Sequence, residues 1–151
     1  MHSSIENFQR RTSDFLDAVA LFPDRLRATA FDGEWSAAYI VHHVSDAELH
    51  FAARYLATIA SDNPTMVYFD EELYPDALRY EKRNITKSLA SISGVRAMVL
   101  DVLSQIDESA LQRITTSEDG KVRTLGELLE LADGHMASHT EQLKELHAKV
   151  S

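Results

Sequence analysis

Apolar residues recur with helical period in four segments of the chain, and the segments between them lack that period. In the first segment, from about residue 3 to residue 21, apolar side chains return every three or four positions until Pro23 ends the pattern. The second runs from about residue 36 to residue 60, and as a helix it would be roughly 37 Å long. The third and fourth cover about 86–106 and 124–150. We therefore predict four long amphipathic helices.

Residues that cap helices stand at the expected starts of three of these segments. Ser3 and Glu6 have capping-box spacing, and so do Thr124 and Glu127, while Ser36 is suited to the N-cap of the second helix. We expect these side chains to satisfy backbone N–H groups that a helix leaves without partners at its first turn.

Two long connections, 61–80 and 107–123, complete the chain. Neither shows a strand with a partner, beyond a short extended piece near Ile114 or Val122. Four amphipathic helices joined in this way predict an all-α fold, a four-helix bundle with one or more crossover connections. We expect residues 1–151 to form a single domain.

The charge of the chain argues against two classes of partner. It carries 24 acidic and 15 basic side chains, which gives a formal net charge of −9. Binding to nucleic acid or to a membrane surface needs a basic face, so we expect neither partner. No targeting segment and no apolar run long enough to span a membrane are visible, so we expect a cytoplasmic protein.

The chain has seven histidines and no cysteine, so nitrogen or oxygen would have to hold any metal. His135 and His139 are four positions apart on the apolar stripe of the last helix, and two imidazoles at that spacing can bind one metal. A hydrogen-bonded pair in the core, without metal, is the other interpretation of this spacing.

His43 borders the core face of the second helix and adds a third inward imidazole. Three histidines with an open fourth position form the ligand set of a catalytic or exchangeable metal site. His42 points about 100° away on the helical wheel, and we expect it to be solvated.

Three further residues are candidates for the surroundings of such a site. Asp46 lies three positions after His43 and could orient its imidazole through the other ring nitrogen. Gln142 has the same spacing from His139, and His50 lies two turns beyond His43. The simpler interpretations are an exposed helical glutamine for Gln142 and a half-buried helix histidine for His50.

Arg96 stands on the apolar stripe of the third helix, where a guanidinium needs an anion. That anion could be a carboxylate of the bundle, which we favour, or a carboxylate of the substrate. Glu48 points away from the His43 face of its helix, and Asp133 lies off the face of His135. The pattern therefore singles out no catalytic carboxylate.

Three motifs of the chain resemble those of the DinB-like superfamily, and the similarity covers nearly the whole sequence. Trp35-Ser36 with His43 eight residues after the tryptophan is similar to the second-helix signature, and His135 and His139 are similar to the last-helix HxxxH. The middle of the chain, PTMVYFDEELY (64–74) with Ser88-Leu89 and Val95-Arg96, resembles the branch that includes bacillithiol S-transferase-like proteins and metal-dependent hydrolases. Two departures are His42 before His43, and Tyr74 where that branch often has tryptophan.

The resemblance implies an up-up-down-down type of bundle with a divalent metal on His43, His135 and His139. The metal is usually zinc or nickel in such proteins; iron, copper and manganese are not excluded, because three imidazoles suit several ions. It also implies a homodimer and a small-molecule substrate.

The function that follows is a thiol-dependent S-transfer, in which the metal lowers the pKa of a low-molecular-weight thiol that then attacks an electrophile. Because the chain has no cysteine, the sulfur would come from a cosubstrate. The alternatives are a metal-dependent hydrolase that uses water, and a bundle that binds metal or a small ligand without catalysis.

Overall fold

The computed structural model describes residues 1–151, and four long helices dominate it. They are α1 (His2–Ala20), α3 (Ala37–Ala60), α5 (Ile85–Gln105) and α6 (Leu125–Val150). The shorter elements are α2 (Asp24–Arg27), β1 (Thr65–Met66), η1 (Glu71–Leu73), α4 (Tyr74–Ala77), η2 (Tyr80–Lys82), η3 (Glu108–Gln112), β2 (Ile114–Ser117) and β3 (Val122–Thr124). The four predicted helices are confirmed to within one or two residues at each end.

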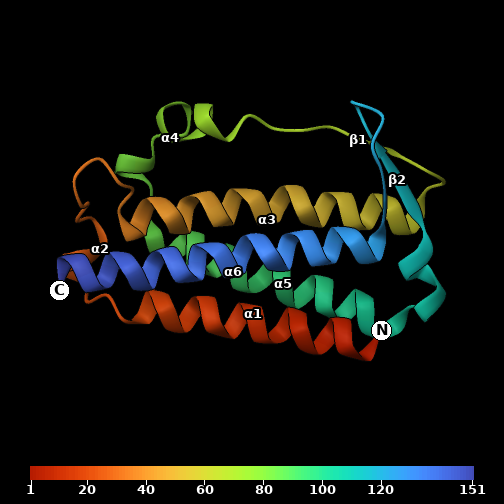
Figure 1. The fold of residues 1–151 in the computed structure, drawn as a ribbon, viewed down its shortest axis with the longest axis horizontal. Coiled ribbons are helices and arrows are strands. Elements are labelled where there is room, and N and C mark those ends of the chain that lie inside the picture. Colours follow the sequence, from red (N-terminus) through yellow and green to blue (C-terminus); the bar gives the residue numbers. More distant parts are fainter.

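The four helices form the predicted bundle, with α1 parallel to α6 and α3 parallel to α5 (Figure 1). The all-α four-helix bundle is therefore confirmed. In chain order the directions are up, down, down, up, so the order of the directions differs from the expected up-up-down-down type. The short connection between α1 and α3 turns the chain back, whereas the long connection from α3 to α5 returns it to the end of the bundle where α3 began.

That long connection, residues 61–84, is called the crossover below. It arches over the outer side of α3 and carries β1, η1, α4 and η2 (Figure 1). At one end, β1 pairs in parallel with β2, and β2 pairs antiparallel with β3, in a three-stranded sheet ordered β1-β2-β3. The extended pieces expected near Ile114 and Val122 are confirmed, and the partner strand at Thr65–Met66 was not foreseen.

The helix starts agree with the predicted caps at two of three places. The Ser36 hydroxyl accepts a hydrogen bond from the Tyr39 N–H at 3.2 Å. Thr124 and Glu127 form both halves of a capping box, at 3.1 and 2.9 Å. The box predicted at Ser3 is wrong, because α1 begins one residue earlier at His2 and has no side-chain cap.

The core consists of two apolar clusters along the bundle axis. Along α5, for example, Ile92 belongs to one cluster and Val99 to the other, and Arg96 lies between them. None of the helices is both long enough and apolar enough to cross a lipid bilayer.

Candidate metal centre

Three imidazoles converge between α3 and α6, and they are the three that the sequence singled out. The Nε2 atom of His135 lies 3.0 Å from Nε2 of His43 and 3.1 Å from Nε2 of His139. One nitrogen of each ring lies within 4.8 Å of the other two. We call these three residues the triad.

The donor atoms of the triad suit a metal ion. The Gln142 side-chain oxygen lies 2.7 Å from Nδ1 of His139, and since that oxygen only accepts, Nδ1 carries the proton and Nε2 offers a lone pair. Ligand nitrogens at 2.0–2.1 Å from a tetrahedral ion are about 3.3 Å apart, close to the spacing seen here. A cation shared by the three rings would bind these facing nitrogens.

Burial keeps the triad in the neutral form that binds metal. Loss of solvent lowers the pKa of His135 to about 3 and that of His43 to about 4, and each is lowered further by the charge of His139. The pKa of His139 is lowered by burial too. The imidazoles are therefore unprotonated at neutral pH, as metal ligation requires.

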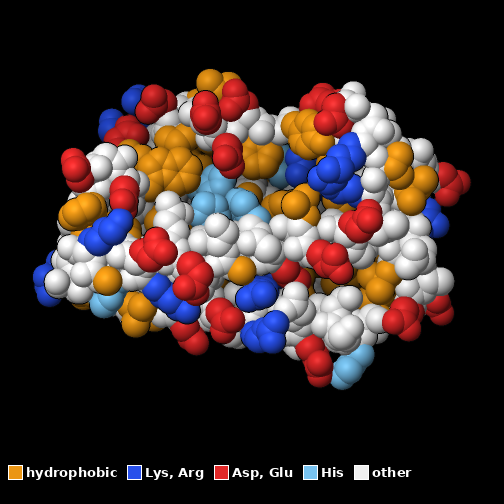
Figure 2. Space-filling view, in the orientation of Figure 1, with side chains coloured by type: hydrophobic (Ala, Val, Ile, Leu, Met, Phe, Trp, Pro, Cys, Tyr) orange, Lys and Arg blue, Asp and Glu red, His pale blue; other side chains and the backbone are white.

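Aromatic rings form the inner walls around the triad, and its outer side faces the crossover. The Trp35 ring is centred 5.2 Å from the His43 ring, and the Phe51 ring 5.9 Å from the His135 ring. Figure 2 shows histidine side chains at the bottom of a hollow, with hydrophobic side chains beside them. The site is thus screened by protein on its inner side and accessible from one face.

Glu71 lies on that accessible side and was missed by the sequence analysis. Its Oε2 atom is 3.4 Å from Nε2 of His43, and its side chain is 55% exposed. It is held by η1, whose first turn is capped by the Asp70 carboxylate accepting from the Glu72 N–H at 3.1 Å. Its neighbours in the sequence are also acidic, so no pattern distinguished it.

Asp46 does not orient His43, contrary to expectation. Its carboxylate instead accepts from the Tyr80 hydroxyl at 2.6 Å and from two nitrogens of the Arg83 guanidinium at 2.9 and 2.7 Å. This cluster fastens the end of the crossover to α3 one turn from the triad. Asp46 acts on His43 only through its charge, which tends to raise the pKa of His43.

His42 is fully buried, and the prediction that it is solvated was wrong. Its Nδ1 atom lies 2.9 Å from the Ser88 hydroxyl oxygen, and its ring is centred 5.3 Å from that of Tyr80. The physical reason is that the crossover covers the outer face of α3, so this part of the helix is buried on every side. Burial lowers the pKa of His42 to about 4.

The depressed pKa of His42 predicts that acid destabilises the fold. Below about pH 6.5 the unfolded chain binds a proton at this position and the folded protein does not, until the pH reaches about 4. The free energy of unfolding therefore falls as the pH decreases through this range, by on the order of 2 kcal/mol between pH 7 and pH 4.5 for this residue. Urea unfolding of metal-free wild type and of His42→Gln at both pH values measures it.

The difference between these two proteins is the informative quantity in that experiment. Glu48 and Asp133 have pKa values raised by burial, so they act in the opposite direction on acidification, but equally in both proteins. An equal loss of stability in wild type and His42→Gln would contradict the prediction. The exposed His2→Gln variant serves as the control.

Arg96 meets carboxylates of the bundle, which is the interpretation that the sequence favoured. Its guanidinium donates to Glu48 at 3.0 Å, to Asp133 at 2.9 Å and to the Phe8 carbonyl at 3.1 Å, and its Nε donates to the Thr12 hydroxyl at 2.6 Å. It also lies 3.6 Å over the Phe8 ring. Glu48 therefore points into the core rather than away from it. All three nitrogens of the guanidinium donate inside the protein, which favours a structural role for Arg96.

The remaining candidates have local partners. Gln142 holds His139, as predicted for a residue beside a metal ligand. The His50 Nε2 atom lies 2.8 Å from the Tyr74 hydroxyl, and its ring stacks on Phe69 at 4.0 Å. His50 thus supports the crossover next to the site and is not a fourth member of the triad.

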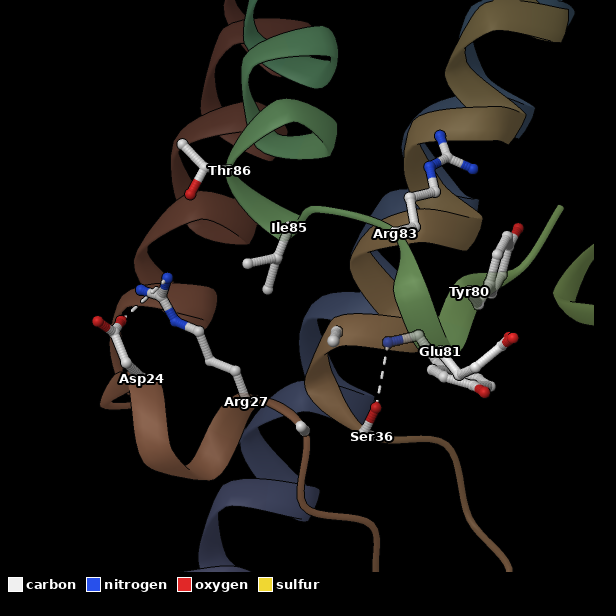
Figure 3. Close-up of a pocket in the computed structure, with 11 residues that line it drawn as sticks. Asp24, Arg27, Ser36, Tyr80, Glu81, Arg83, Ile85 and Thr86 are labelled. Atoms are coloured by element: carbon white, nitrogen blue, oxygen red, sulfur yellow. Dashed lines mark hydrogen bonds and ion pairs between the residues drawn. The ribbon is translucent and has the colours of Figure 1, made fainter.

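A cavity of about 530 Å³ lies at the end of the bundle where α3 and α5 begin (Figure 3). The triad does not line it. Both of its arginines are paired, Arg27 with Asp24 at 3.4 Å and Arg83 with Asp46. Neither arginine is therefore free to bind an anion there.

Comparison with known proteins identifies the family to which this fold and site belong. The sequence matches the DinB superfamily over residues 6–143, so the chain is a member of that superfamily. The resemblance inferred from the three motifs is confirmed.

Within the superfamily, two curated relatives are similar over most of their length. A protein of Geobacillus thermodenitrificans named "putative metal-dependent hydrolase" is 26% identical, with 90% of this chain and 84% of the relative aligned. One of Oceanobacillus iheyensis with the same description is 22% identical, with 93% and 79% aligned. Both names concern metal-dependent chemistry, and they describe those proteins.

Two solved structures share the bundle. YfiT of Bacillus subtilis, described as "a probable metal-dependent hydrolase with an unusual four-helix bundle topology", has a TM-score of 0.87 at 20% identity, over 98% of this chain and 86% of its own. The mycothiol-dependent maleylpyruvate isomerase has a TM-score of 0.76 at 12% identity, over 94% of this chain and 60% of its own. At these identities the likeness shows the fold.

Proposed function

We propose that this protein is a divalent-metal-dependent enzyme acting on small molecules, with His43, His135 and His139 as the metal ligands. The observation that carries the proposal is the convergence of three neutral imidazole nitrogens, at 3.0 and 3.1 Å, between two helices of the bundle. The similarity to relatives named for metal-dependent chemistry supports it.

The reaction we favour is S-transfer from a low-molecular-weight thiol to an electrophile. A divalent ion bound by three imidazoles lowers the pKa of a thiol or water that it binds, which makes either a better nucleophile at neutral pH. In S-transfer the thiol loses its proton, its sulfur bonds to an electrophilic carbon, and a leaving group departs or a double bond takes up the electron pair. The shared bundle of a mycothiol-dependent isomerase supports the choice of a thiol.

The chain's own residues would prepare the site for that reaction. Gln142 fixes the ring of His139, and the Trp35 and Phe51 rings exclude water from the inner side. The Glu71 carboxylate, on the open side, can accept a hydrogen bond from an incoming thiol or water. No cysteine competes with the cosubstrate for the electrophile.

Hydrolysis is the second candidate, favoured by the names of the curated relatives. The same geometry serves it, with water in place of the thiol. Zinc or nickel as the ion, a homodimer and a cytoplasmic location stay predictions from the sequence; metal analysis of untagged protein, light scattering and cell fractionation test them respectively.

Activity assays of metal-loaded protein distinguish the candidates. Monochlorobimane is offered with several small thiols, and a panel of esters and amides is offered without thiol. Conjugation that requires both metal and thiol supports S-transfer. Ester or amide cleavage with no conjugation supports the hydrolase, and inactivity in both assays supports a binding role without catalysis.

Gln142→Ala is expected to weaken metal binding about tenfold, because the partner that holds a ligand imidazole in place typically contributes a factor of 10–100. Competition with a chelating dye measures the affinity. The control is Gln105→Ala, a glutamine of α5 that donates to a carbonyl of its own helix. Equal affinities for the two variants would show that Gln142 does not support the site.

A further inference from the structure

Arg54 is a half-buried cation without a carboxylate partner, in a protein with an excess of acidic residues. One of its terminal nitrogens donates to the Val67 carbonyl at 2.8 Å, and no aspartate or glutamate lies within 4 Å of its guanidinium. Burial lowers its pKa, and the groups that oppose this effect are the phenols of Tyr68 and Tyr55. Buried charges in proteins normally have a counterion, so this arginine lacks an expected one.

The guanidinium borders a cavity of about 240 Å³ between α3 and the start of the crossover. Its lining includes His50 and Arg54 from α3, Pro64, Met66 and Val67 from the crossover, and Thr115 from β2. A space of this volume accommodates a short alkyl chain or a small acid rather than a large ligand. The lining is otherwise mainly apolar, so Arg54 supplies the charge that would orient a ligand there.

One aromatic ring, that of Phe51, is close to both Arg54 and the triad. The Arg54 guanidinium lies 5.6 Å from the centre of the Phe51 ring, and that ring is centred 5.9 Å from the ring of His135. Figure 2 shows basic side chains on the same face as the hollow that contains the histidines. The Phe51 ring is thus a neighbour of both groups, and a ligand that reaches from Arg54 to the triad would have to extend along it.

A carboxylate is the anion that this arrangement fits best. The guanidinium is planar, its fork of N–H groups matches the two oxygens of a carboxylate, and only one hydrogen bond from it is used within the protein. A thiol or water at the triad needs no such partner. The arginine would thus recognise the part of the substrate that does not react.

We propose that the Arg54 cavity binds the carboxylate end of the substrate while the reacting end lies at the triad, which makes the substrate a small aliphatic or aromatic carboxylic acid. The assignment of the reacting end rests on the function proposed above; the binding of the carboxylate does not. Arg54 is a specificity-determining residue in this view.

Hexanoate and its neutral counterpart hexanamide test the inference. Dissociation constants come from NMR titrations of chelator-treated protein, so that metal has no part in the measurement. We expect hexanoate to bind at least about tenfold more tightly than hexanamide in the wild type, and Arg54→Gln to abolish the preference. Equal binding of both compounds by the wild type, or a preference that persists in Arg54→Gln, overturns the inference.

Two further variants separate recognition from support of the crossover. Arg113→Gln removes another arginine that holds the start of the crossover, through the Ser61 carbonyl at 2.9 Å, and the end of α3, through the Thr58 carbonyl at 2.9 Å. Arg113 lies outside the cavity, so this variant should keep the preference. Arg54→Lys keeps the charge without the fork and should retain part of the preference even if Arg54→Gln does not fold. Loss of the preference in Arg113→Gln as well would assign the effect to the crossover and overturn the inference.

The outcome of this binding experiment is independent of the outcome of the activity assays that test the proposed function. If the protein prefers hexanoate but neither binds metal nor catalyses a reaction, the inference of a carboxylate site is supported and the proposed enzymatic function is rejected. Activity with metal and no preference for hexanoate would reject only the role of Arg54.

Discussion

Replacement of His135 by alanine is expected to abolish stoichiometric metal binding and the activity that depends on it. Its Nε2 atom is the one in contact with both other members of the triad, so its loss leaves His43 and His139 without the nitrogen that links them. Loss of a residue that merely orients a ligand already costs 10–100-fold in affinity, and loss of a ligand should cost more, at least about 100-fold.

Metal content of untagged protein by mass spectrometry, together with chelator competition, measures this effect. The matched control is His50→Ala, which removes a partly buried histidine of α3 that bonds to Tyr74 and lies outside the triad. Its metal content should equal that of the wild type. Full metal content in His135→Ala would refute the triad as the metal site, and with it the proposed function.

Replacement of Arg96 by methionine is expected to destabilise the fold by about 3–5 kcal/mol, because the carboxylates of Glu48 and Asp133 are left buried without a counterion. Desolvation already raises the pKa of both groups while the arginine opposes the rise. Urea denaturation at pH 7 measures the change in the free energy of unfolding.

The double variant Arg96→Met with Glu48→Met should recover part of that loss, since it removes one of the two uncompensated carboxylates. Lys144→Met is the control for an exposed ion pair, and there we expect less than about 1 kcal/mol. An Arg96→Met protein as stable as the Lys144→Met protein would mean that the buried ion cluster contributes nothing to the fold.

The sequence was sufficient for the helices and for the triad, because both depend on local spacing. An apolar period of three to four residues specifies a helix face, and His135 and His139 share that face whatever surrounds it. His43 could be added because the second helix must turn its own apolar stripe toward the same core.

The sequence was insufficient where the tertiary arrangement decides. His42 lies off the main stripe of α3, and a helical wheel places it in solvent, but the crossover covers it. Glu48 gave no sign of its partner, because Arg96 belongs to another helix. The helix directions and the position of Glu71 follow from the path of the crossover, and its few short elements leave no periodic pattern to interpret.

The parallel arrangement of α3 and α5 has a consequence for how such proteins diversify. A chain that leaves one end of a bundle and must start its next helix at the other end needs a long return segment. Here that segment carries Glu71, which lies 3.4 Å from Nε2 of His43. Insertions and substitutions at the exposed positions of residues 61–84 can reshape the entrance without touching the packed interior or the three imidazoles. Exchange of this segment between relatives is therefore the most direct route to a new substrate preference on an unchanged scaffold.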